Sequence, residues 1–419
     1  LNEIELAASG IALAFSDNTE WKTPKGSYFS PGIATDDSVS DSRPHVAFLY
    51  PGIGASYVGM GRDLLHLFPQ IFPSVTALAE DIESSLKDRI LNPRSITRLS
   101  PKMLKQRDHA LRNSLAHIAE CGVGYACVYT KIFEQVFKVY ADFSAGYSMG
   151  EVSMYAALGC WQQPGLMSAR LAQSETFNQR LSGELTSLRD QWDLPAVKDG
   201  GPDKIWETYT VRTTSEAFEL AASNESRVYC TIINTPDSLL IGGYPEDCER
   251  VIKALGVKAM PLNMPNAIHS EPAHQEYPHM VSLFTMDVTE RISTKMYSSS
   301  CYLPVPHRTK AIANSIAKCL CDPVDFPRLV NDLYDKGARV FVEMGPGRSL
   351  SSWVDKSLAS TVNHGAVNSR SHASVPVNAK GTPDELTYFR AIAKLISHGV
   401  KLDLDSIFYG SLVVQAGEN

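Results

Sequence analysis

The 419-residue sequence predicts a mixed α/β fold with a mostly parallel sheet and an inserted βαββαβ unit. Two apolar runs, at 45–50 and 339–343, each lead through a glycine-containing turn into a helical pattern, which is typical of parallel strands. The segment 207–262 instead combines short strands and helices in the order βαββαβ. A chain of this length is expected to form two or three cooperating units.

The first 44 residues are predicted to form a linker region. They begin with a helix-like stretch, LNEIELAASGIALAF, and then become rich in Ser, Asp, Gly and Pro. Because the chain begins at Leu1 rather than with a methionine, we expect it to be a segment of a larger protein.

The first core strand is predicted at His45–Tyr50 and is followed by the turn Pro51-Gly52-Ile53-Gly54. This turn lacks the Lys-Ser/Thr pair of a phosphate-binding loop and the glycine spacing of a dinucleotide-binding loop. We therefore expect it to line a pocket rather than to bind a nucleotide.

A helical periodicity over 105–137 leads into a short strand at 141–145 and then into Gly146-Tyr147-Ser148-Met149-Gly150-Glu151. A helix is predicted to follow over 149–158. A strand that enters a helix between two glycines forces the serine into a tight turn with its Oγ exposed, while the Met149 N–H faces the group under attack. The alternative interpretation is a turn serine without function, since G-x-S-x-G also arises by chance.

The segment from 205 to 264 is predicted to be an inserted unit. Its βαββαβ order is ferredoxin-like, with elements at Glu207–Val211, Ser215–Ala222, Arg227–Ile233, Leu239–Gly243, Pro245–Leu255 and Val257–Leu262. A polar insertion without an assigned role, 183–206, precedes it. Further along, 373–383 is expected to be a loop, and 384–408 an amphipathic helix with an extended exit.

Composition excludes several classes of function. The net charge of −7 argues against nucleic acid or an anionic membrane as the main partner, and no apolar run or signal-peptide pattern suits a membrane or secretion. The eight scattered cysteines predict reduced thiols and a cytoplasmic location. His269, His274 and His279 are interrupted by prolines, so we predict no metal site.

Five motifs occur in the order found in the malonyl/acyl-CoA:acyl-carrier-protein transacylase family, and the chain resembles this family over roughly 45–355. They are HVAFLYPGIG with YVGMGRDL behind it, the elbow at 146–151, NTP at 234–236, NAIHS at 266–270 and VEMGPGR at 342–348. The sequences NTPDSLLIGG and GYSMGEVSMYAALGCW and the N-terminal linker are most similar to the acyltransferase subunit of microbial polyunsaturated fatty acid synthases. The resemblance implies a hydrolase-like α/β core formed by 45–204 and 265–372, the ferredoxin-like subdomain at 205–264, and linkers at 1–44 and 373–419.

The resemblance also implies a Ser148–His269 dyad. Ser148 would attack a CoA thioester while His269 takes its proton, and the phosphopantetheine thiol of an acyl carrier protein would collect the acyl group in a ping-pong cycle. The oxyanion donors would be the N–H groups of Met149 and Ile53, although the family usually has Gln at position 53. A backbone carbonyl near Lys336 would orient the imidazole, and no bound cofactor is expected.

Substrate choice is where the sequence departs from the family. Members that select malonyl groups place an arginine on the helix after the elbow, and Gln173 stands at that position. A neutral amide cannot compensate a buried carboxylate, and Arg170 lies three residues earlier. Asn234, Asn266 and Ile268 complete the expected pocket, with Ile268 and Asn266 standing where malonyl-selecting synthases tend to have Phe and His. We predict an uncharged acyl group, with malonyl transfer as the alternative.

Two other classes of protein share parts of this pattern. An α/β-hydrolase esterase would need an HGGG-like loop and an acid before a C-terminal histidine, whereas here the inserted unit separates Ser148 from His269. Hydrolytic release of the acyl chain remains open, and the presence of both residues argues against a non-catalytic docking module. Carrier proteins and neighbouring synthase domains are the expected partners, and the candidate basic contacts are Arg62, Arg339 and Arg348.

Overall fold

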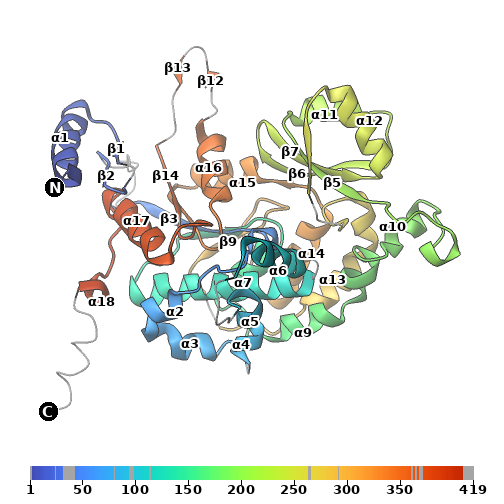
Figure 1. The fold of residues 1–419 in the computed structure, drawn as a ribbon, viewed down its shortest axis with the longest axis horizontal. Coiled ribbons are helices and arrows are strands. Elements are labelled where there is room, and N and C mark those ends of the chain that lie inside the picture. The colour runs from blue at the N-terminus through green and yellow to red at the C-terminus, as the bar shows by residue number, and fades with distance from the viewer. Residues whose placement is uncertain are drawn as a thin grey trace.

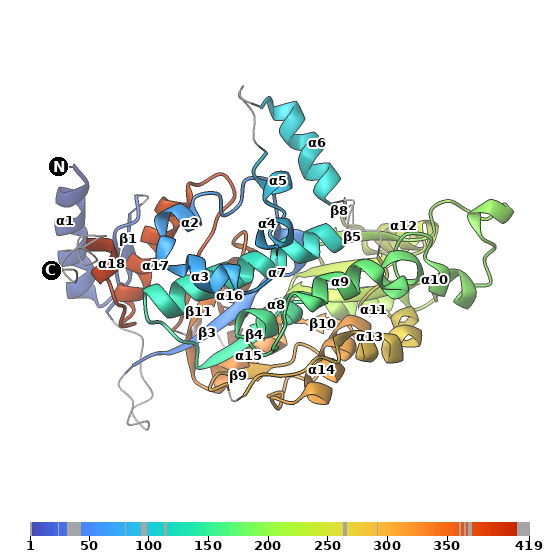
Figure 2. The same cartoon turned by 90° about the horizontal axis from the view of Figure 1, so that it is seen from below.

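The computed structural model describes residues 2–23, 25–31, 43–79, 81–93, 99–112, 115–262, 266–290, 292–359, 362–363, 366–367 and 371–408. A larger α/β core lies beside a smaller unit that carries α11 and α12 (Figures 1 and 2). The predicted fold class, a parallel-sheet core with an inserted βαββαβ subdomain, is confirmed.

The core sheet has five parallel strands in the order β14-β11-β3-β4-β9. Their bounds are β3 (His45–Tyr50), β4 (Phe143–Gly146), β9 (Lys295–Tyr297), β11 (Ala338–Glu343) and β14 (Ala373–Pro376). β3 lies at the centre, and Tyr50 is in register with Gly146. Because the two strands run in parallel, the turn after β3 and the turn after β4 meet at the carboxyl edge of the sheet.

Both faces of the sheet are covered, which explains why β3 is apolar at nearly every position. Phe48 and Tyr50 pack into the core cluster that contains α7 (Leu115–Lys131) and α8 (Gly150–Ala157). Ala47 and Leu49 pack on the opposite face, in the cluster that contains residues of α15 (Phe326–Asp335) and α16 (Ser349–Ala359). Alternate residues of one strand therefore bury against different helices.

The inserted unit follows the predicted order of elements. It consists of β5 (Glu207–Val211), α11 (Ser215–Ala222), β6 (Val228–Thr235), β7 (Ser238–Gly243), α12 (Pro245–Leu255) and β8 (Ala259–Leu262). Its sheet has the order β10-β6-β7-β5-β8, in which β10 (Val324–Asp325) pairs in parallel with β6. β10 follows α14 (Thr309–Cys321), so the core chain contributes an edge strand to the small unit.

The remaining described elements surround the core and connect its layers. They are α2 (Leu64–Leu67), α3 (Phe72–Thr76), α4 (Ile82–Ser85), α5 (Asp88–Leu91), α6 (Pro101–Arg112), α9 (Leu166–Gln173), α10 (Thr186–Gln191), α13 (Tyr277–Phe284), α18 (Asp405–Phe408), β12 (Val362–Asn363), β13 (Ala366–Val367), and the short helices η1 (Ile53–Ala55), η2 (Pro69–Ile71), η3 (Ile132–Val136), η4 (Thr176–Arg180), η5 (Val197–Asp199) and η6 (Glu271–Glu276). None of the described helices combines the length and apolar character needed to cross a bilayer.

The expected N-terminal helix is present as α1 (Asn2–Asp17), and a short hairpin of β1 (Trp21–Lys22) and β2 (Tyr28–Phe29) follows it. Most of the polar stretch of the predicted linker, 32–42, lies outside the described residues.

The expected C-terminal loop and linker were wrong for the first part of 373–419. Residues 373–376 form β14, which pairs with β11 at the edge of the core sheet. In α17 (Asp384–Ser397), Tyr388 is buried, and its ring lies 5.2 Å from that of Phe68 and 6.2 Å from that of Tyr129 (centroid distances). A four-residue strand that ends at a proline is too short to produce a recognisable alternation.

The insertion 183–206, for which the sequence indicated no role, forms α10 and a loop that is held in place by side-chain hydrogen bonds. Arg189 is 5% exposed and donates to the backbone carbonyls of Glu184, Pro195 and Pro202. Trp192 stacks on Trp206 at an interplanar angle of 15°, and its ring centroid lies 6.1 Å from that of Tyr244, the residue before α12. The insertion therefore packs against the small unit.

Candidate active site

The serine elbow forms as predicted between β4 and α8, but Ser148 is buried, at 8% exposure, and not exposed as expected. Ser148 has a φ of +58°, in the left-handed region. A Cβ on Gly146 would lie 2.1 Å from the Glu151 nitrogen, and one on Gly150 would lie 2.1 Å from the Tyr50 carbonyl oxygen. Only glycine fits at either position, so the two glycines force the sharp turn that presents Ser148 at the carboxyl edge of the sheet.

His269 reaches this serine from a loop far along the chain. Its Nε2 lies 2.6 Å from Ser148 Oγ, and its Nδ1 lies 2.7 Å from the carbonyl oxygen of Cys319 and 3.2 Å from that of Asp322. Carbonyl oxygens only accept hydrogen bonds, so Nδ1 carries the proton and Nε2 is left to accept from the serine hydroxyl. The structure therefore brings together the two residues predicted as the dyad.

The residue predicted to orient the imidazole was wrong. Lys336 is exposed at the end of α15, where its N–H donates to the carbonyl of Asp332. The orienting carbonyls belong instead to Cys319 and Asp322, at the carboxyl end of α14. The last carbonyls of a helix lack partners within that helix and are free to accept. Since every residue has a carbonyl, no side-chain motif could identify this one.

Burial sets the protonation state of His269. The side chain is 2% exposed, and its burial lowers the pKa of the imidazole to about 4, against the opposing effect of the two carbonyl bonds. The ring is therefore neutral near pH 7 and can accept a proton from the hydroxyl to which it is bonded.

Of the two predicted oxyanion donors, Met149 belongs to the elbow and Ile53 follows the residue that lies beside it. Among the described residues, no group accepts from the Met149 N–H, which stands at the start of α8. Ile53 opens η1 directly after Gly52, and a Cβ on Gly52 would lie 3.3 Å from the carbonyl oxygen of Tyr147. The backbone after β3 thus runs beside the backbone of the elbow.

The predicted pocket residues have different environments. Ile268 is 8% exposed beside His269, and Asn266 is half-buried. Gln173 is exposed at the last position of α9, and one turn before it Arg170 donates to the backbone carbonyls of Leu283 and Thr285.

Asn234 bonds to the elbow. Its Oδ1 accepts from the Tyr147 hydroxyl at 2.6 Å, which ties β6 of the small unit to the residue before the nucleophile. Tyr147→Phe would leave this buried acceptor without its donor, so we expect the free energy of unfolding to fall by about 1–3 kcal/mol in chemical denaturation. Tyr140→Phe, at a tyrosine that is 59% exposed, is the matched control and should be within about 0.5 kcal/mol of wild type. Equal losses in both variants would contradict a special role for the Tyr147 bond.

One predicted partner contact lies on the wrong edge of the sheet. Arg339 is near the start of β11, whereas Ser148 follows the end of the parallel strand β4. Its guanidinium packs 4.0 Å from the centre of the Tyr334 ring and donates to the Tyr334 carbonyl. Arg62 and Arg348 are exposed.

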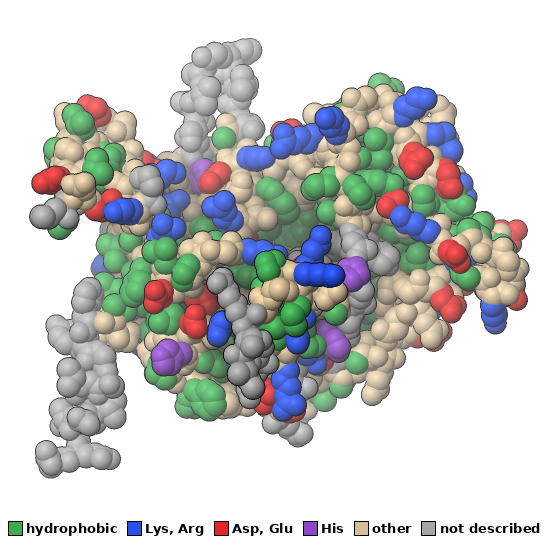
Figure 3. Space-filling view, in the orientation of Figure 1, with side chains coloured by type: hydrophobic (Ala, Val, Ile, Leu, Met, Phe, Trp, Pro, Cys, Tyr) green, Lys and Arg blue, Asp and Glu red, His purple; other side chains and the backbone are tan. Residues whose placement is uncertain are grey.

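The space-filling view shows a hollow between the core and the small unit, with Lys and Arg side chains near its rim (Figure 3).

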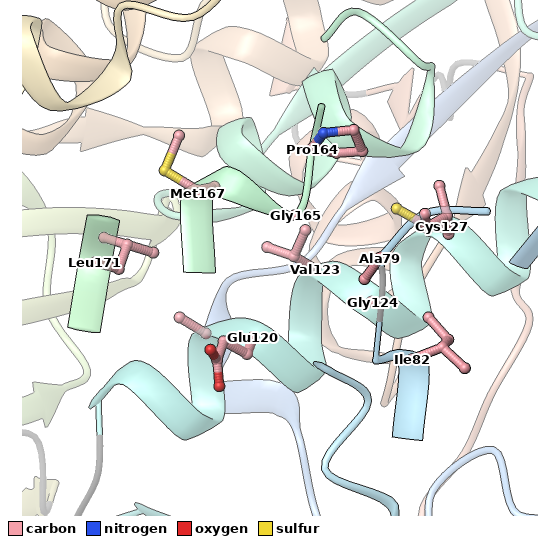
Figure 4. Close-up of a pocket in the computed structure, with 12 residues that line it drawn as sticks. Ala79, Ile82, Glu120, Val123, Gly124, Cys127, Pro164, Gly165, Met167 and Leu171 are labelled. Atoms are coloured by element: carbon pink, nitrogen blue, oxygen red, sulfur yellow. The ribbon is translucent and has the colours of Figure 1, made fainter. Parts of the chain in front are cut away.

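An apolar pocket of about 60 Å³ lies elsewhere, between α4, α7 and α9 (Figure 4). Val123, Cys127, Met167 and Leu171 are among the residues that line it. Neither Ser148 nor His269 contributes to its walls, so this pocket is separate from the dyad.

The other two histidines of the series bind different partners. His274 Nε2 lies 3.2 Å from Asp322, and His279 Nδ1 lies 3.3 Å from Glu276. Within the part of the chain that the structure describes, no group of three or more His, Cys, Asp or Glu side chains is placed to hold a metal ion.

No model of a known protein family matches the chain, but its sequence is similar to synthase subunits and transacylases. One subunit of the polyunsaturated fatty acid synthase of Thraustochytrium sp. is 26% identical over 433 aligned positions, which cover 99% of this chain and 20% of that protein. The malonyl CoA-acyl carrier protein transacylase of Bacillus subtilis is 24% identical, with 74% of this chain and 90% of that protein covered. The chain thus spans a fifth of the length of the first synthase relative, and it spans 13% of another subunit of the same synthase.

Solved structures share the fold. The acyltransferase domain from the second module of the salinomycin polyketide synthase has a TM-score of 0.67 at 20% identity, covering 100% of this chain and 85% of that domain. A malonyl-transacylase solved in complex with a type II polyketide synthase acyl-carrier protein has a TM-score of 0.59 at 18% identity, covering 82% and 98%. The similarity predicted from the five motifs is confirmed by these relatives.

Proposed function

We propose that the chain is an acyltransferase that moves an acyl group from a CoA or carrier-protein thioester to the phosphopantetheine of an acyl carrier protein. The observation that carries this proposal is the 2.6 Å contact between Ser148 Oγ and His269 Nε2 on a strained elbow. The names of the relatives, synthase subunits and transacylases, supply the class of reaction. Because the chain spans a fifth of its synthase relative, its place among neighbouring synthase domains in the cytoplasm is part of the proposal.

The geometry suits a ping-pong reaction. Ser148 Oγ attacks the thioester carbonyl carbon while His269 Nε2 takes the hydroxyl proton. The oxyanion accepts from the N–H groups of Met149 and Ile53. The C–S bond then breaks, and the imidazolium returns its proton to the departing thiolate. In the second half-reaction, His269 takes the proton of the phosphopantetheine thiol, and the sulfur attacks the acyl-serine ester. The new thioester leaves as the regenerated hydroxyl receives the proton, so no cofactor other than the thioester substrates is required.

We further propose that the acyl group is uncharged. A buried carboxylate without a cation would lose several kcal/mol of solvation. Arg170 is bonded to backbone carbonyls, and Arg180 on η4 is bonded to Glu276 and Ser187. Gln173 is neutral and exposed. Malonyl transfer is the second candidate, because several of the relatives carry that activity in their names.

Competitive labelling tests the choice of acyl group. With radiolabelled acetyl-, long-chain acyl- and malonyl-CoA, we expect an uncharged group to label Ser148 at least about tenfold faster than malonyl, a difference near 1.4 kcal/mol. Gln173→Arg should increase malonyl labelling relative to acetyl. Faster malonyl labelling of the wild type would contradict the proposed specificity while leaving acyl transfer intact.

The decay of the labelled protein distinguishes transfer from hydrolysis. We expect acyl-Ser148 to persist in buffer and to decay when a holo acyl carrier protein is added. Equally fast decay without the carrier protein would indicate a thioesterase-like release.

A further inference from the structure

A buried carboxylate, that of Glu151, lies beside the dyad without touching the reacting atoms of Ser148 and His269. Glu151 is three residues after Ser148, in the first turn of α8, and is 0% exposed. Its N–H closes the elbow by donating to the Ser148 carbonyl at 2.9 Å. Its side chain turns toward three hydroxyl-bearing residues, Ser299, Ser315 and Tyr155.

We propose that Glu151 is a positioning residue that sets the geometry of Ser148 and His269 by fixing α8 to α14 and to the segment after β9. The inference rests on the proposed function in one respect only, that the two residues act as a dyad. Nothing in it depends on the identity of the acyl group or of the carrier protein.

One path of contacts runs from the carboxylate to the histidine. Glu151 Oε2 accepts from the Ser299 hydroxyl at 2.9 Å and from the Ser299 N–H at 3.2 Å. The same hydroxyl oxygen lies 3.0 Å from Cys319 Sγ. Burial and then the nearby Glu151 carboxylate raise the pKa of the Cys319 thiol. The carbonyl of Cys319 is the group that holds His269 Nδ1 at 2.7 Å.

A second path reaches the same helix. Ser315 donates to Glu151 Oε1 from α14, one turn before Cys319, and the Tyr155 hydroxyl lies 3.4 Å from that oxygen. Both carboxylate oxygens therefore receive two donors each, which offsets the cost of burying the group. The helix that orients His269 is thus bonded to the helix that begins at the nucleophile.

Such anchoring is required because the backbone is strained at both residues of the dyad. Ser148 has a φ of +58° and His269 a φ of +60°. Conformations of this kind persist only when the surroundings over-determine them. Cys319 Sγ also lies 3.6 Å from the Ser148 carbonyl, so the paths meet at the elbow itself. Release of either helix would lengthen the contact between Oγ and Nε2, and a misplacement of about 1 Å can cost about 10²-fold in rate.

The test measures the rate at which a fluorophosphonate modifies Ser148, a reaction that needs the dyad and no acyl-CoA or carrier protein. We expect Glu151→Ala to lose about 10²-fold in this rate. Glu151→Gln should stay within about tenfold of wild type, because its amide oxygen can accept from the Ser299 N–H while the hydroxyls of Ser315 and Tyr155 rotate. Recovery in the glutamine variant would separate positioning from a need for charge.

Glu343→Ala provides the matched control. Glu343 is 1% exposed at the end of β11 and accepts from the N–H groups of Leu350 and Ser351 at the start of α16. Its removal should lower the melting temperature at least as much as Glu151→Ala and leave the phosphonylation rate within about threefold of wild type. Equal rate losses in the two variants, or a folded Glu151→Ala protein that reacts at the wild-type rate, would overturn the proposal.

Ser299→Ala is the second variant, and it tests the proposal even if the Glu151→Ala protein does not fold. It removes one hydroxyl from the path and should slow phosphonylation by about tenfold, whereas a wild-type rate would overturn the proposal. If wild-type protein is phosphonylated but takes no label from any acyl-CoA, the proposed function fails and the positioning role of Glu151 can still be measured.

Discussion

Ser148→Ala is expected to eliminate the acyl-enzyme and to lower acyl transfer by about 10⁴-fold or more. The hydroxyl at position 148 is the one bonded to His269 Nε2, and alanine has no atom that can carry an acyl group. Alanine also keeps the Cβ of serine, so the strained φ at this position costs no more than in wild type. Intact-protein mass after incubation with acyl-CoA should show one added acyl group in wild type and none in the variant.

Ser144→Ala is the matched control for this substitution. Ser144 is buried in β4, four residues before the nucleophile, and its hydroxyl donates to the Phe48 carbonyl at 3.1 Å. Its loss should cost about 1 kcal/mol of stability and leave acylation unchanged. Persistence of the acyl adduct in Ser148→Ala would contradict the assignment of the nucleophile, as would its loss in a folded Ser144→Ala protein.

Elements with local signals could be predicted from the sequence. The predicted bounds of β3, β5, α11 and α12 coincide with those in the structure. For the helices the reason is chemical. The Thr214 hydroxyl accepts from the Ala217 N–H at the start of α11, and α12 begins at Pro245 and ends before Gly256, which has a φ of +65°. Each signal lies within a few residues of the boundary that it defines.

Elements defined by distant partners could not be predicted. β10 has two residues and β14 has four, and each exists because a strand elsewhere in the chain offers hydrogen-bonding groups. The same reason explains the error at Lys336, since the carbonyl of Cys319 is selected by where α14 ends in space. The dyad itself was recognisable because its side chains carry the chemistry. The way in which its histidine is oriented depends on backbone geometry.

His269→Ala is expected to slow acylation of Ser148 by about 10²–10⁴-fold. In wild type, burial holds the pKa of the imidazole at about 4. The acylation rate should therefore be nearly constant from pH 8 down to about pH 5 and should fall about tenfold per pH unit below 4. In the variant the inflection near pH 4 should be lost. Single-turnover labelling across this range measures both effects, and a wild-type inflection near pH 6.5 would show that the imidazole is not buried in solution.

The same pKa shift makes stability depend on pH in a direction that can be checked. An unfolded histidine has a pKa near 6.5, so between pH 6.5 and 4 the unfolded chain binds a proton at position 269 that the folded protein excludes. The contribution is fully present above pH 6.5 and is lost as the pH falls toward 4, with a slope of up to about 1.4 kcal/mol per pH unit.

Burial also lowers the pKa of His398 to about 4, which adds a second contribution of the same sign. Burial raises the pKa of Glu343 to about 7. This third contribution to stability has the opposite sign, because it is lost as the pH rises. The difference in unfolding free energy between wild type and His269→Ala isolates the first contribution, since the other two groups are unchanged. This difference should shrink between pH 6.5 and 4.5, whereas a constant difference would mean that His269 titrates alike in the folded and unfolded protein.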